Sequence, residues 1–286
     1  MSAGTEGENG SANTSRSSDL RVRTFSAIVL MPPAIIIAYL GGIFYTVGVA
    51  LLGYLLAMEW CAMVSRPDHR NLDRTLSFGL LISLIAAGIG YWTAAIGLLF
   101  GILVVAVAAA FMAKGGRWLA AGVGYSGLAC LSLILLRQGS AGTFLLLLLL
   151  TIVWSTDIAA YFVGRSIGGP KLWPAVSPKK TWSGSIGGLV FGVLAGIGLL
   201  MTFGVTPNGE VVLLTILLSM ATQVGDLIES AFKRYFSVKD SGNLIPGHGG
   251  VLDRLDGLLL AAIVATLLGA GNNPLFAVAN EITVGF

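Results

Sequence analysis

Apolar residues along this chain occur in long uninterrupted runs, with polar residues gathered in short segments between them. We count nine such runs, each close to the roughly 20 residues that a helix needs to cross about 30 Å of hydrocarbon. The expected spans are residues 24–40, 43–64, 76–91, 94–112, 118–136, 142–163, 183–203, 211–232 and 256–271. The pattern therefore predicts an all-α, polytopic integral membrane protein with about nine transmembrane helices.

Composition supports this class. The chain is 55% hydrophobic and 11% charged, with a mean hydropathy of +0.85, whereas a soluble domain carries about 25% charged residues. The net charge of +3 is small and its cations are scattered over short loops, which excludes a nucleic-acid partner. Cys61 and Cys130 lie in apolar runs without a second cysteine or a histidine at metal-binding spacing, so we expect buried free thiols.

The spans divide the chain into four parts. Residues 1–23 are polar and should form a disordered cytoplasmic segment, because they hold few residues that could build a core. The first apolar run begins only after Arg23 and further spans follow, so the start does not resemble a cleaved signal peptide. Residues 24–140 should contain about five helices, and residues 141–271 about four catalytic helices with two cytoplasmic loops. Residues 272–286 should form a short external tail.

Basic residues predict the orientation. With the N-terminus in the cytoplasm, 16 of the 17 Lys and Arg residues fall in cytoplasmic segments, and Arg137 is the exception. Cytoplasmic loops of membrane proteins are enriched in Lys and Arg. We therefore expect a cell (inner) membrane protein with a cytoplasmic N-terminus and active site and an external C-terminus.

Two glycine patterns favour helix packing over ligand binding. Gly122, Gly124 and Gly127 form a GxGxxG, but no strand precedes it and it lies inside an expected span, where a dinucleotide could not reach. Glycines at every fourth position of the seventh span form one smooth stripe, against which a neighbouring helix can approach closely. The stripe consists of Gly184, Gly188, Gly192 and Gly196. The chain has no Walker A lysine, GxSxG elbow or HExxH, which removes three common enzyme classes.

The candidate chemistry lies in residues 223–257. Carboxylates, which bind divalent metals, occur there beside cations and glycines, which bind polyphosphates. The acids are Asp226, Glu229, Asp240, Asp253 and Asp256, the cationic side chains are Lys233, Arg234, Lys239, His248 and Arg254, and the glycines are Gly247, Gly249 and Gly250. An Asp near the centre of a membrane helix costs roughly 3 kcal/mol, so acids inside spans are usually functional.

Plainer interpretations stay open for parts of this segment. Glu229 could simply pair with Lys233 one turn later. One of Asp253 and Asp256 could be a helix cap, and the PGHGG sequence before them could be a surface turn. Another acid, Asp157, stands inside the sixth expected span ahead of a second cationic loop, and its role is open as well.

Both segments resemble the phosphatidate cytidylyltransferases (CDP-diacylglycerol synthases). From Ser230 to Asp256 the similarity includes Lys233-Arg234, Lys239-Asp240, the residues from Pro246 to Gly250, Asp253-Arg254 and Asp256. The earlier loop is similar through Asp157, Ala160-Tyr161, Gly164-Arg165, Lys171-Leu172, Pro174, Ser177 to Trp182 and Gly184. Residues 1–140 match only as generic spans, apart from the Glu59-Trp60 pair. Ile158-Ala159 and Ser183 depart from the family pattern, so neither Ile158 nor Ser183 receives a catalytic role.

The resemblance implies transfer of CMP from CTP to phosphatidic acid, giving CDP-diacylglycerol and pyrophosphate, with Mg²⁺ and a second, monovalent cation such as K⁺. It implies Asp226, Asp253 and Asp256 as metal ligands, and Lys239, Arg254 and His248 as further catalytic residues. Residues expected to bind the nucleotide are Ser177, Lys179, Lys180, Thr181, Lys233, Arg234, Asp240, Gly249 and Gly250. The expected partners are CTP, phosphatidic acid and membrane lipids, and assembly as a homodimer is left open.

Two alternatives come from other classes. A related CTP-dependent lipid enzyme, such as a polyprenol kinase or an archaeol-type cytidylyltransferase, would use similar chemistry on another lipid. An ion-coupled transporter could use Asp157 and Asp226 as ion sites, since acids inside membranes often mark ion paths. An enzyme is favoured because the acids occur beside a glycine-rich, cationic loop suited to phosphate. The sequence also lacks an inverted repeat.

Overall fold

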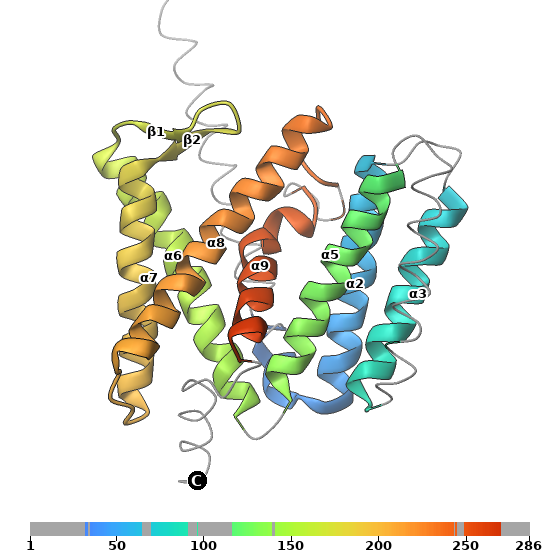
Figure 1. Ribbon diagram of the computed structural model, residues 1–286, viewed down its shortest axis with the longest axis horizontal. Coiled ribbons are helices and arrows are strands. Elements are labelled where there is room, and N and C mark those ends of the chain that lie inside the picture. Colours follow the sequence, from blue (N-terminus) through green and yellow to red (C-terminus); the bar gives the residue numbers. More distant parts are fainter. Residues whose placement is uncertain are drawn as a thin grey trace, which may run out of the picture.

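The computed structural model describes residues 32–33, 35–64, 70–90, 96, 116–138, 141–242, 244 and 249–269. Its helices and strands are labelled in Figure 1. The helices are α2 (Gly42–Val64), α3 (Arg70–Gly88), α5 (Gly116–Arg137), α6 (Gly142–Ile167), α7 (Trp182–Thr202), α8 (Gly209–Tyr235) and α9 (Leu252–Gly269). The strands are β1 (Lys171–Trp173) and β2 (Ser177–Thr181).

These helices overlap seven of the predicted spans and confirm the fold class, although α3 begins at Arg70 rather than at residue 76 and α9 begins at Leu252 rather than at residue 256. Five of them are long and apolar enough to cross a membrane, namely α2, residues Arg117–Arg137 of α5, α6, α7 and α8. Most of span 24–40 and nearly all of span 94–112 lie outside the described residues, so the count of nine stays a prediction. The predictions for residues 1–23 and 272–286 also fall outside them.

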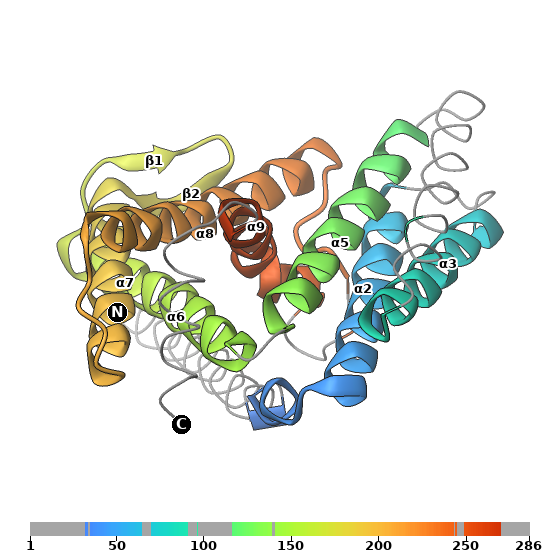
Figure 2. The same cartoon turned by 60° about the horizontal axis from the view of Figure 1, so that its bottom comes forward.

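The helices form two groups joined by a central pair. Figure 1 shows α2, α3 and α5 on one side, α6 and α7 on the other, and α8 and α9 between them, and Figure 2 shows the same grouping from a second direction. One continuous cluster of buried apolar side chains extends through all of these helices. Because α9 contacts both α8 and α5, a group placed on α9 can be positioned by both sides of the molecule.

The glycine stripe has the packing role that its spacing predicted. It lies on α7 against α6, and an added Cβ at Gly188 would stand 2.8 Å from the carbonyl oxygen of Thr156. At Gly196 the added atom would stand 2.8 Å from Ile152, also on α6. In the same way, a Cβ at Gly122 would overlap the indole of Trp60, so Gly122 lets α5 pack closely against α2, whereas a Cβ at Gly124 would meet nothing within 4 Å among the described residues.

A β-hairpin between α6 and α7 was not predicted. Its antiparallel strands pair Lys171 with Thr181 and Trp173 with Ser177. Figure 1 places it beyond the end of α6 and the start of α7, on the same side as the C-terminal end of α8. The side chain of Thr181 accepts a hydrogen bond from the backbone N–H of Gly184 at 3.1 Å and thereby caps α7.

Arg137 has a local structural role. Its Nε donates to the carbonyl oxygen of Ala38 at 2.8 Å, and its Nη2 donates to that of Tyr39 at 3.3 Å. Residues 35–40 are helical, so the guanidinium satisfies carbonyl groups at the end of a helix. Arg137, the one cation outside the predicted cytoplasmic segments, thus has a structural contact of its own.

The two cysteines are buried free thiols, as predicted.

Candidate active site

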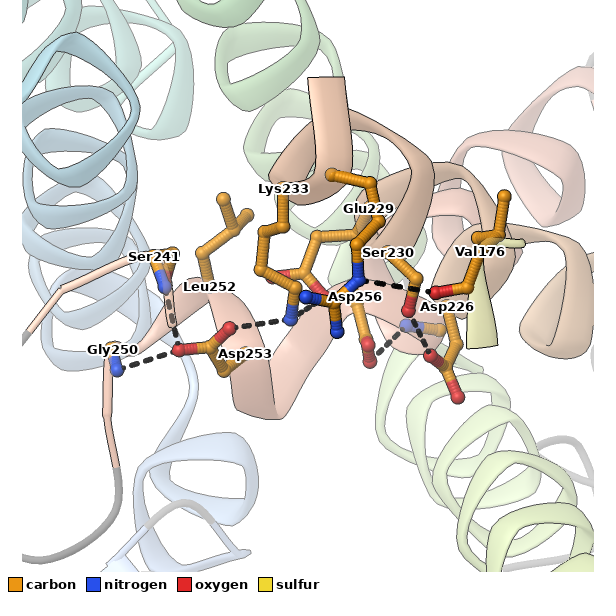
Figure 3. A network of polar contacts seen from close by, with 12 residues as sticks. Val176, Asp226, Glu229, Ser230, Lys233, Ser241, Gly250, Leu252, Asp253 and Asp256 are labelled. Carbon is orange, nitrogen blue, oxygen red and sulfur yellow. Dashed lines mark hydrogen bonds and ion pairs between the residues drawn. The ribbon is translucent and has the colours of Figure 1, made fainter. Parts of the chain in front are cut away.

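Asp226 lies on α8 and is held from two elements. Lys180, from β2 of the hairpin, forms an ion pair with its Oδ2, and the hydroxyl of Ser230 one turn later donates to its Oδ1 at 3.3 Å. Figure 3 shows this carboxylate at one end of a polar network that extends across α8 to α9. The hairpin is therefore fixed to the acid-bearing face of α8.

Three aspartates from three helices face a common region. The carboxyl group of Asp157 on α6 interacts electrostatically with Asp256 on α9 and Asp226 on α8, and with Lys180. Asp256 interacts with Asp226 and with Glu229, and its Oδ1 accepts from the backbone N–H of Gly257 at 2.7 Å. Carboxylates that interact with one another are destabilised in their charged form unless a cation offsets the repulsion.

Glu229 adds a buried acid to this region. It is 5% exposed, and its Oε1 receives no hydrogen bond from a donor among the described atoms, while its carboxyl group lies against that of Asp256. A buried carboxylate oxygen without a partner is costly, which makes it a natural place for a cation to bind. Within the described ranges, however, no three His, Cys, Asp or Glu side chains converge closely enough to form a ready metal site. The acids fit a metal ion in chemistry, while their side chains are not gathered around one point.

Lys233 joins the acids of α8 to α9. Its Nζ lies 3.2 Å from Oε2 of Glu229 and 2.7 Å from Oδ1 of Asp253. The Lys233 side chain is 13% exposed and that of Asp253 is 8% exposed, so this is a nearly buried bridge (Figure 3). The plain pairing of Glu229 with Lys233 is thus observed, and it extends to Asp253.

Asp253 also holds the loop that precedes α9. Its Oδ2 accepts from the backbone N–H of Ser241 at 2.9 Å and from that of Gly250 at 2.8 Å (Figure 3). Gly249 has φ +83, and a Cβ there would stand 2.8 Å from the same oxygen, so both its backbone conformation and its surroundings require glycine. Asp253 therefore stabilises the loop before α9 through backbone hydrogen bonds, in addition to its ion pair with Lys233.

Glu59, on α2, was missed as a site residue by sequence reasoning. It is 6% exposed and accepts hydrogen bonds from the backbone N–H groups of Val251 and Leu252 at 2.8 and 2.9 Å. The hydroxyl of Ser241 donates to it at 3.3 Å. The available signal was an acid inside an apolar run, the same signal that marked Asp157 and Asp226.

The remaining predicted residues are placed as follows. Four cationic side chains stand exposed on the hairpin, on the end of α8, and around the loop to α9; they are Lys179, Arg234, Lys239 and Arg254, and Asp240 is exposed beside them. Nε of Arg234 donates to the carbonyl oxygen of Val176 at 3.4 Å, which brings the end of α8 to the hairpin. Ser177 is half-buried in β2, Thr181 is used as a cap, and His248 lies outside the described residues.

Known proteins are similar to this chain over most of its length. Residues 21–270 match the model of the cytidylyltransferase family. The chain is 43% identical to a phosphatidate cytidylyltransferase of Brucella suis over 264 residues, which cover 88% of this chain and 94% of that protein. It is 33% identical to one of Staphylococcus haemolyticus over 265 residues, covering 87% and 98% respectively. A shorter region of 109 residues is 53% identical to one of Bacillus subtilis, covering 38% of this chain and 40% of that protein. From its family match and its similarity to these enzymes over most of its length, the chain belongs to the cytidylyltransferase family.

Proposed function

We propose that this protein transfers CMP from CTP to the phosphate of phosphatidic acid, producing CDP-diacylglycerol and pyrophosphate. The observation that carries the proposal is the 43% identity over 88% of the chain to a protein named phosphatidate cytidylyltransferase. The site supports it, because acids on α6, α8 and α9 lie beside exposed cations at one end of apolar helices. CTP can arrive there from water, while a diacyl lipid stays in the bilayer.

In this reaction an oxygen of the lipid phosphate forms a bond to the α-phosphorus of CTP. The bond from that phosphorus to the bridging oxygen breaks, and pyrophosphate leaves with the electron pair. A phosphomonoester is largely anionic at pH 7, so no strong general base is needed. The main obstacle is repulsion between two anionic substrates, which positioned positive charge reduces.

The exposed cations are suited to that task. Four cationic side chains are exposed to solvent and can contact a phosphate without leaving a buried environment; they are Lys179, Arg234, Lys239 and Arg254. Arginine can present two parallel N–H groups to one phosphate, which gives Arg254 a directional role that lysine would not fill. Lys233 differs, because it is nearly buried between Glu229 and Asp253. We assign it to holding α8 and α9 together before any contact with phosphate.

The donor set also fits a divalent metal. Asp226, Asp253 and Asp256 would hold Mg²⁺, in keeping with the electrostatic interaction between Asp226 and Asp256, whereas Asp253 is held by Lys233 and by two backbone N–H groups. For Asp253 to bind metal through Oδ1, the Lys233 ammonium 2.7 Å away would have to move. When bound, Mg²⁺ would supply positive charge next to the phosphates. A second, monovalent cation such as K⁺ remains part of the proposal.

The lipid substrate can be tested directly. Purified protein in detergent would receive CTP with phosphatidic acid, a polyprenol or an archaeol-type ether lipid phosphate, and the products would be identified by mass spectrometry. CDP-diacylglycerol formed from phosphatidic acid at the highest rate supports the proposal. Product from only one of the other lipids would overturn it. Turnover without any ion gradient would also separate an enzyme from an ion-coupled transporter.

We further propose that the active site faces the cytoplasm of a cell whose inner membrane holds the protein. The charge distribution supports this orientation, and the carbonyl contacts of Arg137 account for its one exception. Assembly as a homodimer stays open to test, and light scattering on the purified protein in detergent would measure the mass of the assembly.

A further inference from the structure

Glu59 stands at the start of α9 although it belongs to α2. Its Oε1 accepts from the N–H of Val251 at 2.8 Å, and its Oε2 accepts from the N–H of Leu252 at 2.9 Å. Leu252 is the first residue of α9. The first N–H groups of a helix have no partner within the helix, and they carry partial positive charge. A carboxylate from a remote helix therefore acts here as the N-terminal cap of α9.

The same carboxylate is linked to Asp253 through Ser241. The Ser241 hydroxyl donates to Oε2 of Glu59 at 3.3 Å, while its backbone N–H donates to Oδ2 of Asp253 at 2.9 Å. The N–H of Gly250 also donates to that oxygen of Asp253, at 2.8 Å. The loop residues Ser241 and Gly250 are thus held between two carboxylates, and Figure 3 shows both of them directed at Asp253.

The space around Glu59 leaves no room for adjustment. A Cβ added to Gly242 would stand 3.0 Å from Oε1 of Glu59, and one added to Gly250 would stand 2.5 Å from Oε2. Both glycines therefore let the backbone of the loop close around the carboxylate. At 6% exposure Glu59 has little contact with water that could replace these hydrogen bonds.

We propose that Glu59 is a positioning residue of the active site, which fixes the loop before α9 and thereby orients Asp253. This inference rests on the proposed function, since Asp253 matters for catalysis only if the site carries out the transfer. Among the described residues, Glu59 forms hydrogen bonds with the loop and with none of the proposed metal ligands. It acts through the N–H groups of Val251 and Leu252 and through Ser241, and so couples α2 to the acid-bearing start of α9.

The test compares Glu59→Gln, Glu59→Asp and Ser241→Ala with Glu210→Gln as the matched control. Glu210 is an exposed acid in the first turn of α8, away from this loop. The amide of Gln has one acceptor oxygen in place of two, so it cannot receive both backbone N–H groups in the same way. Asp keeps the charge and both oxygens on a shorter side chain. Ser241→Ala removes only the hydroxyl link, and it guards against failure of a Glu59 variant to fold.

Two readouts are measured on the purified full-length chain. Hydrogen exchange of the peptide covering residues 238–255 should become about tenfold faster or more in Glu59→Gln, as expected when hydrogen bonds to a charged group are lost. In a mixture of CTP, phosphatidic acid and Mg²⁺, kcat per folded molecule should fall by about tenfold to a hundredfold, while KM for CTP changes by less than about threefold. Ser241→Ala should show a smaller change in both readouts, Glu59→Asp should retain more activity than Glu59→Gln, and Glu210→Gln should match the unchanged protein.

The outcomes separate this inference from the proposed function. Faster exchange with unchanged kcat in Glu59→Gln would mean that Glu59 holds the loop without serving catalysis, which overturns the inference. Unchanged exchange would overturn it at the structural step. If the unchanged protein does not convert CTP and phosphatidic acid, the proposed function fails, and the catalytic part of the inference fails with it. The exchange measurement would then still show whether Glu59 holds the start of α9. If no Glu59 variant folds, Ser241→Ala decides: normal exchange and normal kcat there would contradict the inference.

Discussion

At the scale of single residues, Asp226 and Asp253 occupy different surroundings, and their Asn variants should differ accordingly. Both should lose at least about a hundredfold in turnover if they share one metal-dependent step. Asp226 has an ion pair with the half-exposed Lys180, so Asp226→Asn should cost less than about 1 kcal/mol in stability. Asp253 accepts two backbone N–H groups and faces Lys233, so Asp253→Asn should cost about 2 kcal/mol or more.

Turnover of CTP with phosphatidic acid and thermal unfolding of the purified variants measure both quantities. Equal melting temperatures for the two variants would contradict the role of Asp253 in folding the loop. Full turnover with an unchanged Mg²⁺ requirement in either variant would remove that residue from the set of metal ligands.

Lys233 gives a second prediction at this scale. Replacing it with Met would leave Glu229 and Asp253 buried without their shared cation. Loss of one partner of a buried ion pair typically costs about 3–5 kcal/mol. We therefore expect a large drop in melting temperature for Lys233→Met, compared with almost none for Lys179→Met on the exposed hairpin. A melting temperature close to that of the unchanged protein would show that the bridge contributes little.

Arg254 tests the proposed contact with phosphate. Arg254→Lys keeps the charge but loses the planar pair of donors, so turnover should fall by about tenfold or more, as for a transition-state contact. Because Arg254 is exposed, its melting temperature should stay within a few degrees of that of the unchanged protein. Near-normal kinetics would contradict the phosphate contact. Arg254 would then be only one of the basic residues that set the orientation in the membrane.

The residue scale also shows the limits of reading a sequence. The cost of an acid in hydrocarbon singled out Asp157 and Asp226, and the spacing of Glu229 and Lys233 allowed their ion pair to be foreseen. The bridge from Lys233 to Asp253 depends on how α8 and α9 cross, which spacing alone does not determine. The contacts of Glu59 with Val251 and Leu252 join residues more than 190 positions apart, so no local pattern could reveal them.

At the scale of elements, the glycines of α7 allow a matched test of helix packing. An added Cβ at Gly188 would stand 2.8 Å from the carbonyl oxygen of Thr156, whereas no described atom lies within 4 Å of one at Gly198 on the same helix. Gly188→Ala should destabilise the protein by about 1–3 kcal/mol, because α6 and α7 must move apart. Gly198→Ala should be neutral or stabilising by up to about 1 kcal/mol, since Ala favours the helix.

Thermal unfolding of the two variants in one detergent checks this prediction. Equal stability would mean that the close approach of α6 and α7 is not required.

Element boundaries were predictable where length and hydropathy decided them, as in α6 and α8. The β-hairpin was not, because its strands are only three and five residues long and the second is rich in polar residues. Its pairing depends on the fixed ends of α6 and α7.

At the scale of the whole molecule, the expected orientation can be tested with single cysteines. Arg70→Cys, Lys171→Cys and Asn243→Cys should react with a membrane-impermeant thiol reagent only from the cytoplasmic side. Gln138→Cys, just after α5, should react only from outside and serves as the control. The native thiols of Cys61 and Cys130 are 1% and 0% exposed, so their background should be low. Labelling of any of the first three from outside intact cells would contradict the orientation.

The proposed reaction is defined by which phosphorus of CTP reaches the lipid, and isotopic labelling of CTP measures this directly. Purified protein with phosphatidic acid and Mg²⁺ would receive CTP labelled at either the α- or the γ-phosphorus. A cytidylyl transfer predicts that the α-label enters the lipid product and the γ-label is recovered in pyrophosphate. Transfer of the γ-label to a lipid, with the α-label left in CDP, would identify a kinase and contradict the account.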